Sequence, residues 1–255
     1  MKKPPLANRH PELTIFAQMV AGETSKGILL IEAESGLGKT DLLAQFALNC
    51  PHDVCFISID LKAAQTGIPY VFWRVREELR QETFPRFTAA VEQLVRVTNV
   101  NIEKNWVLGQ LDIQIAMSRD EQTRGFRLIA LQEAFFEDLR ATNRRLVIVL
   151  DTFNAAAVEL EGWIGGAFLA AAARTAGLVV VVAGQNVPAT NIEWIDSYEH
   201  RKLEGIHDVD EWHTSMEAVG LVLEKNVIHA FTEVFDGHPL KIMSAFEKLA
   251  KEKGL

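Results

Sequence analysis

The stretch AESGLGKT, residues 33–40, is the most informative part of this sequence. It follows a continuous apolar run, GILLIEA over 27–33, and precedes residues 41–48, which have the spacing of an amphipathic helix. An apolar run without polar alternation is typical of a strand that is covered on both faces. The stretch matches the pattern G-x-x-x-x-G-K-[ST], except that Ala33 stands where the first glycine is usual. The sequence therefore predicts a strand, a phosphate-binding loop and a helix in succession.

Each residue type in this loop suits the binding of phosphate. Gly36 and Gly38 let backbone N–H groups approach phosphate oxygens without a Cβ in the way, and the helix that follows adds the positive end of its dipole. The Lys39 ammonium can contact the β- and γ-phosphates, and the Thr40 hydroxyl can bind Mg²⁺. A chance glycine-rich turn is the alternative, which the strand–loop–helix context disfavours. The predicted nucleotide-binding residues of the loop are Ser35, Gly36, Leu37, Gly38, Lys39, Thr40 and Asp41.

A second carboxylate is expected to hold the metal from the opposite side. Asp151 ends the apolar run LVIVLD over 146–151, which is the place of a Walker B acidic residue. A lone Asp after a strand is more often a cap or a turn residue, but the loop upstream favours the metal role. In many ATPases a Glu follows directly and activates the attacking water. Here Thr152, Phe153 and Asn154 follow, and Asn154 can orient a water but cannot take its proton. Nucleotide binding is therefore better supported than rapid hydrolysis.

The remaining apolar runs predict the rest of the sheet. Residues 54–61 and 178–183 read as buried strands, and 201–205 as a short fifth strand, with helices between them. Strands separated by helices predict parallel βαβ units. We expect an α/β fold with a parallel five-stranded sheet of the P-loop NTPase type, flanked by helices, over residues 1–206.

Two further segments are expected around this core. Alternating apolar and polar residues over 99–117 predict a β-hairpin inserted between helices. After residue 206 the strand pattern stops, and Asp208 with Glu211 resembles a capping box at the start of a helix. We therefore expect a small C-terminal helical lid domain over 207–255.

Composition excludes several classes of protein. The chain of 255 residues has 34 acidic and 26 basic side chains and a net charge of −8, which disfavours a general nucleic-acid binder. Arg174 and Gly177 interrupt the longest apolar stretch, so no membrane span is expected. Two cysteines cannot supply a disulfide framework, and the seven histidines lack zinc-site spacing. Without a secretory signal, a cytoplasmic location is expected.

With these motifs in place, the chain resembles the STAND-class ATPases, the signal-transduction relatives of AAA+ proteins that include NACHT and NB-ARC modules. The resemblance runs from about residue 6 to 250 and implies that the predicted sheet has the ASCE or AAA+-like form. Asn8-Arg9 with Glu12-Leu13 resembles the opening motif, which lies near the adenine in relatives. Residues 178–185, LVVVVAGQ, resemble the sensor strand, and residues 237–240, GHPL, resemble the G-x-P motif of the helical lid.

The resemblance implies ATP and Mg²⁺ as ligands and assigns further residues. Asn8, Arg9, His238 and Pro239 would join the loop in binding the nucleotide, with the proline packed on the base. Gln185 would lie near the γ-phosphate. The residues expected to take part in catalysis are Lys39, Asp151, Asn154 and Gln185.

This chain departs from the family at two of those positions. Bacterial relatives often carry an acidic residue three places after the Walker B Asp, where Asn154 stands, and often Arg at the sensor position, where Gln185 stands. Both differences remove a charge that would act on the γ-phosphate or the water. Relatives also usually carry an effector and a repeat sensor, for which 255 residues leave no room. A stand-alone switch, or an excerpt of a longer protein, is therefore expected.

Three functions remain open from the sequence. The favoured one is a switch in which closure on Mg-ATP controls self-association or an effector partner, with ATP or ADP as the nucleotide. The alternative is an active ATPase whose base comes from Asn154 with a water, from Glu159 or from a neighbouring subunit. A scaffold with a purely structural loop is disfavoured, because its Lys-Thr pair has no packing purpose. An arginine finger in a homo-oligomer is a further option, and its candidates are Arg140, Arg144, Arg145, Arg174 and Arg201.

Overall fold

Five parallel strands form one sheet in the order β2-β3-β4-β1-β5. The computed structural model describes residues 9–63, 67–96, 113–114, 117 and 121–252. The strands are β1 (Ile28–Glu32), β2 (Cys55–Asp60), β3 (Leu146–Asp151), β4 (Leu178–Gly184) and β5 (Tyr198–Lys202). Because all of them run the same way, their carboxyl ends meet at one edge. The expected parallel five-stranded sheet is thus confirmed.

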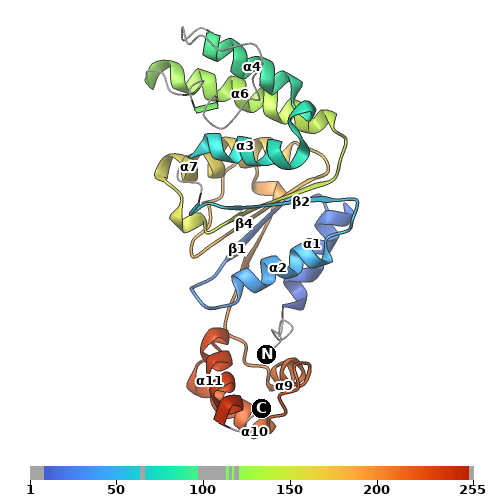
Figure 1. The fold of residues 1–255 in the computed structure, drawn as a ribbon, viewed down its shortest axis with the longest axis vertical. Coiled ribbons are helices and arrows are strands. Elements are labelled where there is room, and N and C mark those ends of the chain that lie inside the picture. Colours follow the sequence, from blue (N-terminus) through green and yellow to red (C-terminus); the bar gives the residue numbers. More distant parts are fainter. Residues whose placement is uncertain (1–8, 64–66, 97–112, 115–116, 118–120, 253–255) are drawn as a thin grey trace.

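Helices cover both faces of this sheet (Figure 1). On one face lie α1 and α2, whose Phe16 and Phe46 rings stack with centroids 4.2 Å apart. On the other face lie α3 and α7, and α4 and α6 form a further layer beyond them. The helices on the two faces are α1 (His10–Ala21), α2 (Lys39–Asn49), α3 (Ile68–Leu79), α4 (Pro85–Arg96), α6 (Glu121–Ala141), α7 (Val158–Trp163) and α8 (Leu169–Ala173).

The sheet residues alternate between two hydrophobic clusters. Leu30, Ile148 and Val180 pack with the helices on the α3 face, whereas Leu29 and Val181 pack with α1 and α2. Every residue of β4 is buried, as expected of a central strand with helices on both sides. The edge strands β2 and β5 are more exposed, and β5 consists of the polar residues YEHRK. Charged edge strands discourage pairing with a further strand.

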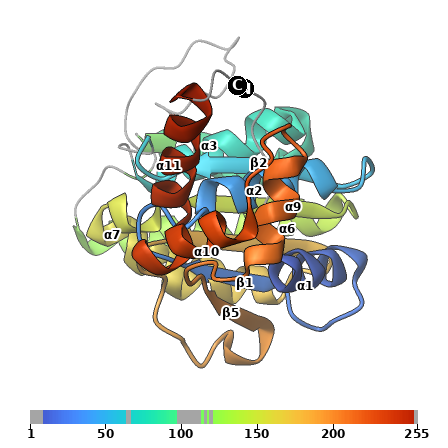
Figure 2. The same cartoon turned by 90° about the horizontal axis from the view of Figure 1, so that it is seen from below.

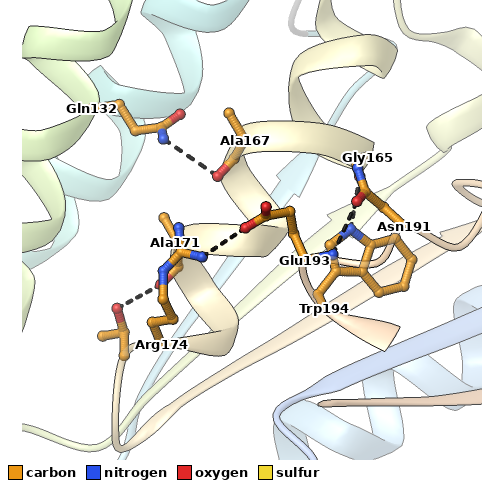
Figure 3. Close-up of polar contacts among 9 residues, drawn as sticks. Gln132, Gly165, Ala167, Ala171, Arg174, Asn191, Glu193 and Trp194 are labelled. Carbon is orange, nitrogen blue, oxygen red and sulfur yellow. Dashed lines mark hydrogen bonds and ion pairs between the residues drawn. The ribbon is translucent and has the colours of Figure 1, made fainter. Parts of the chain in front are cut away.

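The helical stretch between β3 and β4 is divided by a π-helical segment, Ile164–Phe168, between α7 and α8. Figure 3 shows the outside donors that its carbonyl oxygens accept from: Trp194 Nε1 lies 2.8 Å from the Gly165 oxygen, and Gln132 Nε2 lies 3.3 Å from the Ala167 oxygen. Side chains that insert into the ladder of backbone hydrogen bonds are a common cause of such breaks. Through these hydrogen bonds the β4–β5 loop and α6 both contact the π-helical segment.

Three C-terminal helices have a hydrophobic cluster of their own, formed by Trp212, Met216, Phe246 and their neighbours. They are α9 (Val209–Glu217), α10 (Lys225–Val234) and α11 (Pro239–Glu252). Figure 1 shows them below the sheet, on the side of α2, and Figure 2 views the molecule from their side. The expected cap is confirmed, because the Asp208 carboxylate accepts from the backbone N–H of Asp210 at 2.9 Å and of Glu211 at 3.0 Å. The division of the chain at 206/207 remains a prediction.

Two expectations need correction. Most of the hairpin predicted over 99–117 lies outside the described residues, but Ile113, Gln114 and Met117 are described and are helical, so a strand is wrong at these positions. Ile113 and Met117 are both buried, and a separation of four residues places them on one side of a helix. The fifth strand occupies Tyr198–Lys202, three residues before the predicted 201–205.

Candidate functional site

A cavity of about 700 Å³ lies between the carboxyl edge of the sheet and the C-terminal helices. Its volume is in the range of small-molecule sites. The predicted residues that line it are Arg9, Ser35, Gly36, Leu37, Gly38, Lys39, Thr40, Asp41, Asp151, Asn154, Gln185 and Pro239. Thr152 and an apolar wall from the C-terminal helices complete it. The structure therefore brings the separate sequence motifs to one place, while Asn8 lies outside the described residues.

The loop between β1 and α2 has the backbone conformation that its glycines allow. Gly36 and Gly38 have φ values of 83° and 88°, in the left-handed region, and α2 begins at Lys39. Lys39 Nζ donates to the carbonyl oxygens of Ala33 and Glu34, the latter at 3.0 Å, so the ammonium lies across the loop. Burial lowers the pKa of Lys39, and the nearby Asp151 charge opposes that shift. A positive charge is thus held where a helix also begins.

Asp151 supplies the opposing negative charge. Burial raises the pKa of its carboxyl, the Asp60 charge adds to that effect, and a 2.6 Å hydrogen bond from the Thr152 N–H together with the Lys39 charge opposes it. A divalent cation would offset this partly desolvated charge. Mg²⁺ is usually held by one or two carboxylates together with phosphate oxygens and waters. The Thr40 hydroxyl and the Asp151 carboxylate line the same cavity, so the residues present fit Mg²⁺.

Asn154 and Gln185 meet across the ends of β3 and β4. The Gln185 N–H donates to Asn154 Oδ1 at 3.0 Å. The sequence predicts that the Asn154 side-chain amide orients a water, and the family resemblance implies that the Gln185 side chain lies near the γ-phosphate. The structure brings both residues to the cavity and adds the hydrogen bond between them.

The C-terminal helices touch the loop directly. The Leu240 N–H, in the first turn of α11, donates to the Gly36 oxygen at 3.2 Å. The His238 ring lies so close that a Cβ added to Gly36 would be 2.4 Å from its Cε1. His238 is not among the residues that line the cavity, but it packs on the loop that does. The G-x-P segment therefore contacts the phosphate-binding loop.

Arg9 joins the loop to the segment before α9. Its Nη2 donates to the Leu37 oxygen at 3.0 Å and to the Glu204 oxygen at 2.9 Å. Burial lowers the pKa of Arg9, and the Glu12 charge opposes that shift. The resemblance implied a place near the adenine. The structure adds that the guanidinium links two backbone segments at the cavity wall.

Two groups of site residues were not predicted from the sequence. Asp60 is not among the residues that line the cavity, but it ends β2 as the register partner of Asp151, and its charge raises the pKa of Asp151. The only signal for Asp60 is that it also follows an apolar strand, and nothing in the sequence gives the register. The apolar wall of the cavity includes Trp212, Met216, Met243 and Phe246, whose helical spacing reads as ordinary core.

Among the described residues, three of the five candidate arginine fingers pair with acidic residues of this chain. Arg145 pairs with Asp53, Arg174 with Glu193 at 3.0 Å, and Arg201 with Glu199 at 3.6 Å. Arg145 directly precedes β3, at the edge of the sheet opposite the cavity. A role in trans stays a prediction. In the part of the chain that the structure describes, no helix has both the length and the apolar character to cross a membrane.

Comparisons with known proteins show the fold. No model of a protein family matches the chain, and no curated protein matches it. A STAND protein with a tetratricopeptide repeat sensor from Pyrococcus horikoshii aligns over 94% of this chain at 16% identity, with a TM-score of 0.57. Cdc6p from Pyrobaculum aerophilum aligns over 99% at 12% identity, with a TM-score of 0.50. The chain spans 30% and 64% of these two proteins. Its strand order, loop and structural neighbours together give it the fold of the AAA+-related P-loop ATPases.

Proposed function

We propose that this protein is an ATP-binding molecular switch. In this proposal Mg-ATP binds at the loop and at Asp151, and residues 207–255 act as a lid whose closure controls self-association or a protein partner. The observation that carries the proposal is the hydrogen bond between the Leu240 N–H and the Gly36 oxygen. It joins the first turn of α11 to the loop on which the phosphates would lie.

Differential contact with the nucleotide explains how a switch would work. A ligand shifts a conformational equilibrium only as far as it binds one state better than the other. Phosphates bound at the loop would lie next to the contact between the loop and α11. The nucleobase, between the sheet and the apolar wall of the cavity, would contact the C-terminal helices as well. The Pyrococcus protein is a signal-transduction ATPase, and its structural likeness to this chain supports a switch.

Slow hydrolysis follows from the residues near Asp151. Thr152 follows it directly in place of a Glu, and Asn154 and Gln185 are neutral. None of these three side chains is a general base. The proposed switch would therefore stay in its ATP-bound state for long periods.

Calorimetric titration with Mg-ATP tests the proposal. We expect binding to the wild type and a loss of binding in Lys39→Ala, because the ammonium is the main positive charge of the loop. Lys26→Ala is the matched control, since Lys26 Nζ donates to the Asp196 oxygen away from the cavity. Absence of binding to the wild type, or equal binding to Lys39→Ala, would overturn the proposal.

One observation favours the alternative of an active ATPase. Asp60 and Asp151 are register partners. Phe56, Val147 and Val149 lie an even number of places before them and pack with α1 and α2, so both carboxylates are on the face where the loop lies. In this alternative Asp60, from the neighbouring strand, takes the proton of the attacking water. Phosphate release that depends on both Asp60 and Asp151, measured with the two Asp→Asn variants, would favour it over slow hydrolysis.

A further inference from the structure

The chain turns unusually between the end of β3 and the cavity. Thr152 has φ 60° and ψ 42°, the left-handed conformation. Four non-glycine residues in the described part of the chain have positive φ, and Thr152 is the only β-branched one among them. This conformation is rare for β-branched residues, and such strain persists only where the surrounding structure imposes it.

Close packing of β4 imposes the turn. A Cβ added to Gly184 would lie 3.1 Å from Phe153 Cβ, 3.3 Å from Asn154 N and 2.4 Å from the Asn186 oxygen, so a residue with a side chain would need the backbone to move. Phe153 is buried, and the Thr152 N–H is held by the Asp151 carboxylate. The strained residue, the glycine and the buried ring together fix the position of Asn154.

The orientation of the Asn154 amide is fixed as well. Oxygen and nitrogen of such an amide are assigned from their partners. The Gln185 backbone N–H can only donate, so the atom 3.0 Å from it is Oδ1. Nδ2, with two N–H donors, is therefore on the other side of the amide. Asn154 is exposed and lines the cavity with Lys39 and Asp151.

We propose that Asn154 donates through Nδ2 to the terminal phosphate of a nucleoside triphosphate, and so makes the site discriminate triphosphate from diphosphate. This inference rests on the proposed function. It gives the amide a role in addition to the expected orientation of a water, because Oδ1 accepts from the Gln185 N–H while Nδ2 has two N–H donors. A donor at this place gains a partner when a third phosphate is present. The hydrogen bond through Oδ1 then joins that phosphate to the start of the β4–β5 loop.

The variant Asn154→Asp gives a sharp test, because it has the same shape. It keeps an oxygen for the Gln185 N–H and replaces the Nδ2 donor by a second carboxylate oxygen. We expect the affinity for a non-hydrolysable Mg-ATP analogue to fall about 10- to 100-fold, the size expected for a lost hydrogen bond to a charged group. The affinity for Mg-ADP should change by less than about 3-fold, because its phosphates do not reach the amide.

Asn154→Ala is the second variant, and thermal unfolding is followed for both. Alanine removes the donor without adding charge, so it should also reduce the preference for triphosphate. A ratio of the two affinities that stays at the wild-type value in both folded variants would overturn the inference, since a merely structural Asn154 would leave that ratio unchanged. If the wild type binds neither nucleotide, the proposed function itself fails. If Lys39→Ala loses both while Asn154→Asp keeps the ratio, only the inference about Asn154 fails.

Discussion

At the scale of single residues, the site contains two partly buried charged side chains, and burying them opposes folding. Burial lowers the pKa of Lys39 and raises that of Asp151, so each group is less favourable in its charged form than it would be in water. Their mutual attraction opposes both shifts. Binding sites often hold such perturbed groups because the ligand supplies the missing charge.

Asp151→Asn should stabilise the free protein at neutral pH. The raised pKa means that the folded state binds the Asp151 proton more tightly than the unfolded state does. Stability is therefore lost as pH rises from about 3.8 through the folded pKa, and that loss persists at neutral pH. Asparagine cannot ionise, so the melting temperature of the variant should exceed that of the wild type at pH 7 and converge with it toward pH 4. Thermal unfolding without nucleotide measures this.

Asp53→Asn serves as the control of opposite sign. The hydrogen bond from Arg145 lowers the pKa of Asp53, so its ionised form favours folding above the unfolded pKa. Its loss should lower the melting temperature at pH 7, or leave it unchanged where solvent screens the pair. A melting temperature of Asp151→Asn below the wild type at pH 7 would contradict the prediction.

A site residue can be predicted from the sequence when a local motif sets its role, and cannot when contacts between distant segments do. Lys39 and Thr40 were predicted, and lie together, because phosphate chemistry needs these types at one spacing after a strand. Asp60 was not predicted, because its position beside Asp151 depends on the pairing of β2 with β3. The sequence does not encode that pairing locally. The orientation of Asn154 depends likewise on a backbone N–H 31 residues away.

At the scale of elements, the contact between the loop and α11 can be probed through two glycines. Gly36 and Gly38 both have positive φ, so alanine at either should cost about 1 kcal/mol of strain. A Cβ at Gly36 would also meet the His238 ring and lie 3.1 Å from Leu240 Cβ, whereas one at Gly38 meets nothing within 4 Å. We expect Gly36→Ala to be less stable than Gly38→Ala by about 1–3 kcal/mol, the usual cost of overpacking. Denaturant unfolding measures the difference.

His238→Ala provides the matching rescue. In the double variant with Gly36→Ala, the ring that meets the new Cβ is gone, so most of the extra destabilisation should disappear. Equal stability of the two alanine variants, or no rescue by His238→Ala, would show that α11 does not rest on the loop in solution.

Helices and strands could be predicted from the sequence where their buried residues form a clear apolar pattern along the chain. Residues 146–151 were predicted as a strand with the observed bounds, because β3 is apolar from its first residue to its Asp. The strand β5 was displaced by three residues, since its sequence YEHRK carries no apolar pattern and its position comes from pairing with β1. At Ile113 and Met117 alternation suggested a strand, although the same residues also fit a helical spacing of four.

At the scale of the whole molecule, two of the described contacts join the phosphate-binding loop at the cavity to the C-terminal part of the chain. One is the Leu240 hydrogen bond to the loop, and the other is Arg9, whose guanidinium bonds the loop and the Glu204 oxygen. The C-terminal helices have their own hydrophobic cluster, so a ligand in the cavity would act on two packed units at once. At 100 times its dissociation constant, Mg-ATP should stabilise the chain by about 2.7 kcal/mol, which corresponds to about 5–11 °C in melting temperature.

Arg9→Met should separate nucleotide binding from its effect on the C-terminal helices. In the wild type we expect Mg-ATP to slow hydrogen exchange in α9, α10 and α11 as well as in the loop, because the bound state holds both units together. Methionine retains apolar packing but cannot bond the Leu37 and Glu204 oxygens, so protection of the loop should persist while protection of the three helices falls. Arg174→Met is the control, since Arg174 pairs with Glu193 at 3.0 Å on the surface, away from the cavity. Mass spectrometry of exchanged peptides measures both regions, and helix protection in Arg9→Met equal to that of the wild type would mean that Arg9 plays no part in the coupling.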